Sequence, residues 1–189
     1  MRLIHMNIRR EKRMEKGIKK VQIAAYALSA VAAVLCIAGL FASSQAAWKV
    51  NSIIELAVIT IAFIYFYKGC KKDYNKYYKY VMILMLIEYL ASYLEGAFIS
   101  DYVVVTEWWQ DMLSVMVYGS ITLLAFAKDL GKKASLILTG FNSVVYILYV
   151  LCSIGSDTGN LIMSLEWLVV SIICFLMVIG KYKDKENRA

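Results

Sequence analysis

The sequence predicts an all-α, polytopic integral membrane protein built as a bundle of six transmembrane helices. Three observations lead to this fold class. Of the 189 residues, 61% are hydrophobic, the apolar residues form six blocks, and the connections between blocks alternate between basic and neutral or acidic. A soluble domain of this length would not bury so much apolar surface. Each block is close to the roughly 17 to 25 residues of a membrane-spanning helix.

A basic arm at residues 1–20 precedes the first block. The apolar core of the first block is longer than the roughly 7 to 15 apolar residues of a signal peptide. An uncleaved first span is therefore preferred over a signal peptide cleaved after Ala46. A basic tail at residues 181–189 follows the last block. Within the transmembrane domain, residues 21–180, the spans are expected at residues 21–42, 52–67, 80–100, 112–127, 134–153 and 161–180.

The positive charges predict how these spans are oriented. All but one of the 21 lysines and arginines fall in the arm, the second and fourth connections, and the tail; the exception is Lys49. The positive-inside rule therefore places both termini in the cytoplasm, with three helical hairpins in the cell membrane. The hairpins share a Trp-containing outer segment and lysines at their inner ends, which either an internal triplication or membrane anchoring alone would produce.

Several function classes find no support in the composition. The net charge of +7 is spread over short segments between apolar runs, which does not predict nucleic-acid binding. The only histidine, His5, lies in the basic arm, and no nucleotide-binding glycine motif occurs, so no enzyme activity and no cofactor are expected. The cysteines occur singly and are interpreted as apolar fillers or free thiols, with neither disulfides nor a metal site. They are Cys36, Cys70, Cys152 and Cys174.

The third block carries two carboxylates, Glu88 and Glu95, which share one helical face with Ser92. Ionisable groups in hydrocarbon are costly and usually face a bundle interior or a water-filled cavity. A functional role competes with a structural one here, in which Glu88 hydrogen-bonds to a neighbouring helix and Glu95 reaches headgroup water. By contrast, Glu55, Asp111 and Glu166 are expected near the outer starts of inward-running helices, where a negative charge complements the helix dipole.

Polar residues at helical spacing in the fourth and fifth spans are expected to face this stripe, although hydrogen bonds between helices would also account for them. The fifth span contributes Thr139, Asn142, Tyr146 and Tyr149, and the fourth contributes Asp111, Ser114, Tyr118 and Thr122. The expected ligand-binding residues are Glu88, Ser92, Tyr93, Glu95, Asp111, Tyr118, Asn142 and Tyr146.

These residues favour a protein that binds or transports a small cationic or amphipathic solute through an outward-facing acidic and aromatic cavity. The alternative is a non-transporting sensor, immunity factor or accessory subunit of a larger membrane complex. In that case a small-residue face of the first span, Ala25, Ser29 and Ala33, would pack against another subunit or against this chain itself. The lysines of the second connection are expected to contact anionic lipid headgroups.

Overall fold

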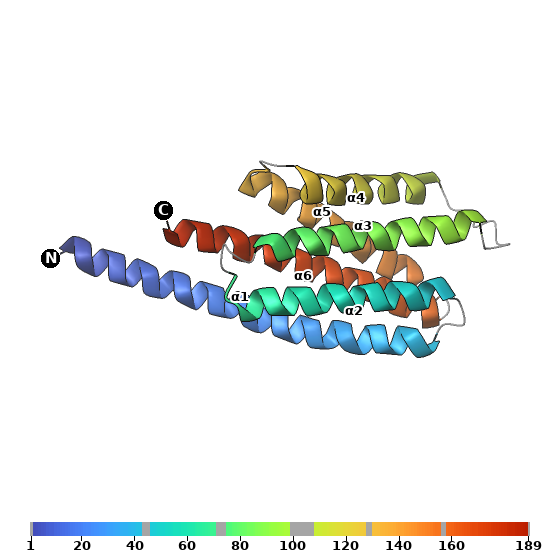
Figure 1. Ribbon diagram of the computed structural model, residues 1–189, viewed down its shortest axis with the longest axis horizontal. Helices are drawn as coiled ribbons and strands as arrows, with labels where there is room; N and C mark the ends of the chain where they lie inside the picture. The colour runs from blue at the N-terminus through green and yellow to red at the C-terminus, as the bar shows by residue number, and fades with distance from the viewer. Residues whose placement is uncertain are drawn as a thin grey trace.

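The chain is all-helical in the residues that its computed structural model describes (Figure 1), which confirms the all-α part of the predicted fold class. Those residues are 2–42, 46–70, 75–98, 108–127, 130–155 and 158–188, with side chains described for 16–41, 49–70, 76–91, 112–127, 130–155 and 158–182. The six helices are α1 (Arg2–Ala42), α2 (Ala46–Tyr67), α3 (Asn75–Phe98), α4 (Trp108–Phe126), α5 (Lys132–Ser153) and α6 (Thr158–Arg188).

Four helices contain segments that are long and apolar enough to cross a membrane. These segments are Lys16–Phe41, Lys49–Tyr67, Lys132–Ser153 and Thr158–Tyr182, and a shorter apolar segment is Met112–Phe126. Large apolar side chains such as Val34, Phe41 and Ile137 are exposed on the outside of the bundle. An outer surface of this kind is suited to lipid and is consistent with a multi-pass membrane protein.

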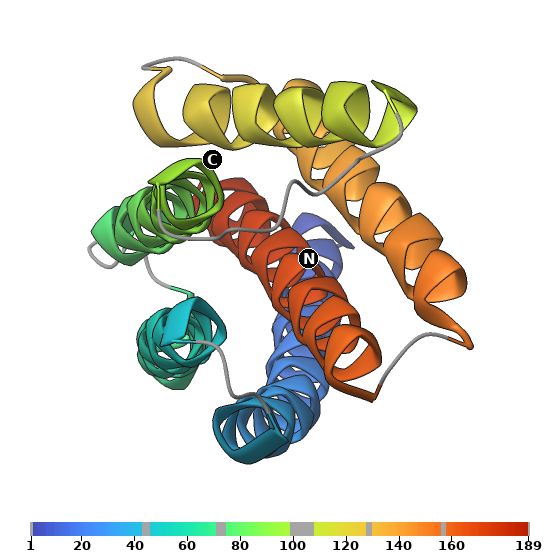
Figure 2. The same cartoon turned by 90° about the vertical axis from the view of Figure 1, so that its right-hand side faces the viewer.

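Helix α6 occupies the centre of the bundle. It packs against α1, α2, α3 and α5, whereas α4 lies at the periphery against α3 and α5 (Figure 2). The start of α1 and the end of α6 lie at the same end of the molecule (Figure 1). This end is called the terminal end below, and the opposite end is called the distal end.

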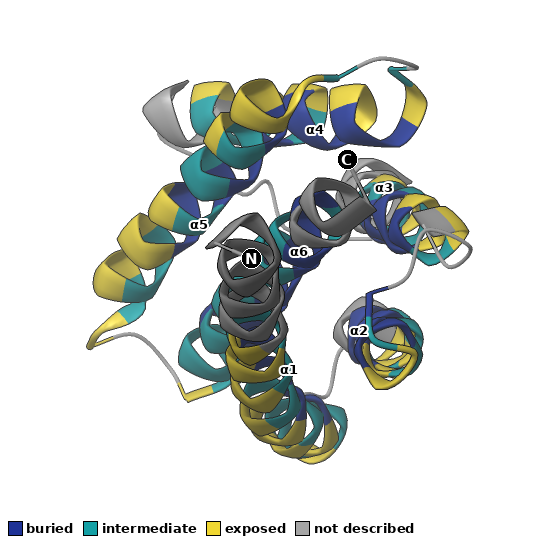
Figure 3. Cartoon of the chain, turned by 90° about the vertical axis from the view of Figure 1, so that its left-hand side faces the viewer, coloured by how far each residue is buried: buried dark blue, intermediate teal, exposed yellow. Residues whose placement is uncertain are grey.

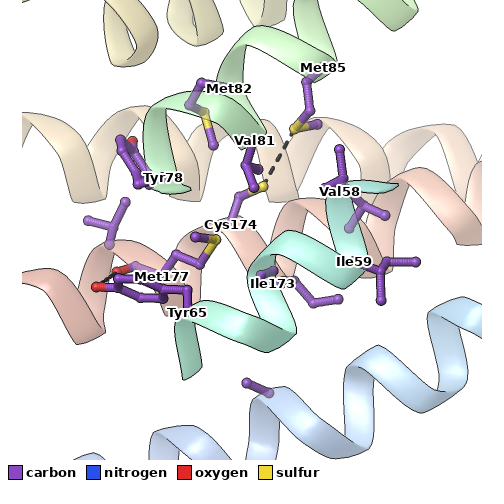
Figure 4. Packing of buried hydrophobic residues seen from close by; sticks show 14 of the residues in the cluster. Val58, Ile59, Tyr65, Tyr78, Val81, Met82, Met85, Ile173, Cys174 and Met177 are labelled. Atoms are coloured by element: carbon purple, nitrogen blue, oxygen red, sulfur yellow. Dashed lines mark hydrogen bonds between the residues drawn. The ribbon is translucent and has the colours of Figure 1, made fainter. Parts of the chain in front are cut away.

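Apolar side chains fill the space around α6, and the buried residues of each helix face inward while exposed ones face outward (Figure 3). Ile173 and Met177 of α6 meet Tyr65 of α2 and Met82 of α3, all with at most 1% of their surface exposed (Figure 4). Because each of these neighbours packs on α6, the central helix determines which side chains of the outer helices meet.

All six helices begin before the apolar blocks that predicted them; α1, α2 and α6 begin at Arg2, Ala46 and Thr158. Hydropathy detects the apolar stretch, but backbone hydrogen bonding continues through adjoining polar residues. As a result, Glu55 and Glu166 lie more than two turns inside their helices. The helix dipole acts mainly within the first turn, so it does not account for their positions as expected from the sequence.

The small-residue face of α1 is directed into the chain's own bundle. Ala25 and Ser29 are buried and Ala33 is half-buried, and α1 packs against α2 and α6. Small side chains allow helices to approach closely. Of the two expected packing partners, another subunit or this chain itself, Ala25 and Ser29 pack against this chain.

Candidate functional site

Three carboxyl groups meet inside the bundle, each supplied by a different helix. Glu55 comes from α2, Glu88 from α3 and Glu166 from the central helix α6. Their exposed fractions are 1%, 6% and 2%, so all three face the protein interior and none faces lipid. Intramembrane carboxyl groups in such positions are uncommon and usually functional.

Neighbouring side chains hold each carboxyl group in place. The Cys36 thiol of α1 donates to Glu55 Oε2 at 3.5 Å, and the Ser52 hydroxyl donates to Glu166 Oε2 at 3.2 Å. The indole Nε1 of Trp167 donates to Glu88 Oε1 at 3.1 Å. The carboxyl group of Glu55 is also within hydrogen-bonding reach of those of Glu88 and Glu166. The three groups thus form one cluster.

One oxygen of Glu55 and one of Glu166 remain without a hydrogen-bond partner among the described residues. These are the Oε1 atoms, and both are completely buried. Together with Cys36, the two glutamates offer one sulfur and two oxygen atoms that all lie within 4.8 Å of one another. Buried polar atoms are nearly always paired, so one unpaired oxygen on each of two neighbouring carboxyl groups indicates a place that accepts a proton or a ligand.

Gly39 of α1 leaves the room that Glu166 needs. A Cβ atom at this position would collide with Glu166 Oε1 and would lie 2.8 Å from Ser52 Oγ. Glycine therefore allows the α1 backbone to approach the polar cluster directly. The lack of a side chain at Gly39 is part of the construction of the site.

Aromatic rings enclose Glu88 on the side of α4 and α5. The Trp167 ring lies 6.0 Å from Tyr146 and 6.3 Å from Tyr149, measured between ring centroids. Tyr89 of α3, adjacent to Glu88 in sequence, stacks on Tyr118 of α4. The predicted residues Glu88, Tyr118 and Tyr146 thus belong to one neighbourhood.

Asn142 lies one helical turn from Tyr146, toward the terminal end. It accepts a hydrogen bond from the Ser120 hydroxyl and lines a cavity of about 10 Å³ between Met85 and Cys174. That volume has room for about one water molecule. Asn142 is buried, as the periodicity of α5 predicts, but its observed contact is with α4 and not with the carboxyl groups.

Four of the predicted site residues lie outside the residues whose side chains are described. They are Ser92, Tyr93, Glu95 and Asp111. The contribution of Glu95 to the acidic stripe therefore stays a prediction. Thr122 of the predicted α4 stripe is exposed, so this stripe does not face inward along its whole length.

Sequence reasoning did not include Glu55, Glu166 or Cys36 in the site. The two glutamates were assigned to helix starts, and the cysteine was interpreted as an apolar filler. One signal was available, because Ser52 and Glu55 are three residues apart and share a helical face, like Ser92 and Glu95. Without knowledge of which helices touch, that signal had no more weight than any other polar stripe.

The charges of the cluster require compensation. Within the described part of the chain, neither Glu55 nor Glu166 pairs with a lysine or arginine. Several negative charges in contact and away from water would be very costly. A hydrogen bond between two carboxyl groups also needs a proton on one of them. The cluster must therefore hold either protons or a bound cation.

Thiolate and carboxylate donors together suit cations of the Zn²⁺ type, whereas Mg²⁺ and Ca²⁺ prefer sites made of oxygen alone. Metal binding would deprotonate the Cys36 thiol, which supplies the softer donor. The thiolate and two carboxylates would bring three negative charges to a divalent ion, so one negative charge would remain at the site. Comparisons with known proteins add nothing to this assignment, because no protein-family model, curated protein or solved structure gives a significant match to the chain.

Proposed function

We propose that this chain is a multi-pass protein of the cell membrane with six spans and both termini in the cytoplasm. Four segments of sufficient length and apolarity, together with a shorter apolar helix, support the spans. The concentration of lysines and arginines in segments at the terminal end supports the orientation. In this orientation Glu55 and Glu166 lie in the outer half of the bundle.

The protein's proposed function is to bind a divalent transition-metal cation of the Zn²⁺ type between α1, α2 and α6. The observation that carries this proposal is the pair of buried, unpartnered oxygens of Glu55 and Glu166 beside the Cys36 sulfur. Glu88 approaches the same carboxyl groups from α3 and is held by Trp167, so it acts as a further acid or a proton acceptor beside the ion. The proposal narrows the expected cationic solute to an inorganic ion.

The small separation of the donor atoms favours an ion over an amphipathic molecule. Donors within 4.8 Å of one another surround a space of single-ion size. Among the described residues, the aromatic Trp167 donates a hydrogen bond to Glu88, whereas Glu55 and Glu166 accept from Cys36 and Ser52. The recognition of an organic cation by cation–π attraction places rings around the charge. An ion bound within the bundle in this way suits a carrier or a membrane ion sensor.

Direct metal binding to the full-length protein in detergent tests the proposal. Equilibrium dialysis with Zn²⁺ should give about one ion per chain, and Co²⁺ should give the absorption band of a thiolate ligand. Glu55→Gln and Glu166→Gln should abolish the stoichiometric ion, and Cys36→Ser should remove the thiolate band. The matched control is Cys152→Ser, because Cys152 is exposed and does not belong to the group of donors around Cys36.

The same experiment can contradict the proposal. Absence of stoichiometric Zn²⁺ or Co²⁺ binding, or binding that survives both glutamine substitutions, would show that the cluster is not a metal site. Uptake of Zn²⁺ into proteoliposomes then separates a carrier from a sensor. A carrier accumulates the ion in a Glu55-dependent manner, whereas a sensor binds it without uptake.

A further inference from the structure

A basic cavity lies at the terminal end, far along α3 and α6 from the acidic cluster. It has a volume of about 310 Å³. Its polar lining comes from Lys76, Tyr78 and Lys79 at the start of α3, Ser135 at the start of α5, and Lys181 near the end of α6. With Leu124 of α4 also in its lining, the cavity lies between four helices, α3, α4, α5 and α6.

The lining of this cavity is positively charged. Three of the lining residues are lysines, and none of the lining residues that the structure describes is acidic. Lys181 is oriented by two aromatic rings, because its Nζ lies 5.0 Å from the ring centroid of Tyr78 and 5.5 Å from that of Tyr182. Ammonium groups gathered at one opening lower the cost of bringing in an anion.

Tyr78 adds an independent observation. Only 3% of this residue is exposed, and its hydroxyl is buried without a hydrogen-bond partner among the described residues. Figure 4 shows its ring at the start of α3, beside the apolar core. A buried hydroxyl usually finds a partner, and Tyr78 belongs to the lining of the cavity, so a ligand there is a candidate partner of this hydroxyl.

We propose that this cavity binds a phosphate group, and that the headgroup of an anionic phospholipid supplies it. Lysine ammonium groups and a hydroxyl donor are the chemistry that recognises phosphate. Basic pockets between helices at the membrane surface are positioned to receive headgroups. The volume, close to the lower limit of about 300 Å³ for small-molecule sites, accommodates a headgroup while the acyl chains stay in the bilayer. This site does not depend on metal binding at the acidic cluster.

Lipid selectivity of the full-length protein tests the assignment. The protein would be reconstituted in nanodiscs of phosphatidylcholine containing increasing fractions of phosphatidylglycerol, and retained lipid would be counted by native mass spectrometry after release. The cavity variant is Lys76→Gln/Lys79→Gln/Lys181→Gln. The control variant is Lys16→Gln/Lys19→Gln/Lys20→Gln, which removes the same charge from exposed positions on α1.

Retention of one phosphatidylglycerol should be at least about tenfold weaker in the cavity variant than in the control. Equal retention in both variants would overturn the proposal, because it would mean that diffuse charge attracts the lipid. Tyr78→Phe keeps every charge and should still weaken retention severalfold. If this substitution has no effect on retention, the assignment of the hydroxyl is overturned even if the lysine variant fails to fold.

A second arm distinguishes the source of the phosphate. Inorganic phosphate would be titrated into delipidated protein in detergent at constant ionic strength, with thermal unfolding as the readout. If the protein retains phosphatidylglycerol and inorganic phosphate does not stabilise it, the lipid headgroup is supported as the source of the phosphate group. Stabilisation that Tyr78→Phe abolishes, without lipid retention, assigns the cavity to soluble phosphate and overturns the lipid source. Failure of both arms overturns the site.

Discussion

The acidic cluster and the basic cavity place opposite charges in different surroundings. Glu55, Glu88 and Glu166 are almost completely buried, and Glu55 lies within hydrogen-bonding reach of the other two. Lys76 and Lys79, in contrast, are exposed on the start of α3, and Lys181 rests on aromatic rings. The acids depend on the protein for compensation, whereas the lysines retain access to water and ions.

This difference determines how each region responds to change. Interactions between buried charged groups are weakly screened by salt, but those of exposed charges fall off within about 8 Å at physiological ionic strength. Substitutions in the acidic cluster should therefore alter binding and stability by large amounts at any salt concentration. Substitutions in the basic cavity should have small effects on stability and salt-dependent effects on binding.

The largest expected effect comes from removing one acid of the cluster, which tests the difference between the acidic cluster and the basic cavity. Glu55→Gln should lower Zn²⁺ affinity by at least about 100-fold, because loss even of an outer-shell partner of a metal site costs about 10- to 100-fold. Lys79→Gln, the matched substitution in the basic cavity, should leave this affinity within about twofold of the unchanged protein. Equilibrium dialysis at two salt concentrations measures both. A similar loss in the two variants would mean that the two regions are not independent.

Substitution of glycine tests how tightly the acidic cluster is enclosed. Gly39→Ala places a methyl group against Glu166 Oε1 and Ser52 Oγ, and overpacking at such a site costs about 2 kcal/mol. Gly119→Ala in α4 is the control, because a Cβ atom there meets nothing within 4 Å. The control should gain about 0.5 kcal/mol from helix propensity. Denaturant unfolding followed by circular dichroism should therefore give a lower free energy of unfolding for Gly39→Ala and a higher one for Gly119→Ala.

Loss of the Trp167 donor should have a moderate effect. Trp167→Phe removes the 3.1 Å hydrogen bond to Glu88 and should lower the free energy of unfolding by about 1.5 kcal/mol, as expected for a hydrogen bond to an acidic group. A double-mutant cycle with Glu88→Leu separates this bond from the loss of ring area. If Trp167→Phe costs as much in the Glu88→Leu background, packing and not the hydrogen bond is responsible.

The helices were predictable from the sequence because lipid exposure leaves a direct pattern of apolar blocks. The prediction of the second span ended at Tyr67, where α2 ends, and that of the fifth ended at Ser153, where α5 ends. The starts of α2 and α6 were placed too late, because helical hydrogen bonding extends into polar residues that hydropathy excludes. This error assigned Glu55 and Glu166 to helix starts.

The composition of the candidate site could be predicted only in part. Periodicity showed that Thr139, Asn142 and Tyr146 share the buried face of α5, and the helix has this face inward. Periodicity does not specify which helices touch. The meeting of Glu55, Glu88 and Glu166 depends on the central position of α6, which follows from the packing of the whole bundle (Figure 2). Glu88 was recognised because its depth in an apolar block was itself the signal.

The smallest predicted effect concerns two tyrosines at the basic cavity. Tyr78→Phe removes a buried hydroxyl that lacks a hydrogen-bond partner, so it should raise the free energy of unfolding by about 0.5 kcal/mol in lipid-free detergent. Tyr182→Phe removes a donor that bonds to the Leu130 carbonyl oxygen at 2.7 Å, so it should lower the same quantity by about 1 kcal/mol. Thermal unfolding of the two variants side by side measures this difference. In anionic lipid, Tyr78→Phe should instead be less stable than the unchanged protein, because a ligand stabilises only the protein that binds it. The effect of Tyr182→Phe should keep its sign. A Tyr78→Phe variant that is less stable than the unchanged protein without lipid would show that the hydroxyl already has a partner, and the basic cavity would lose an uncharged donor.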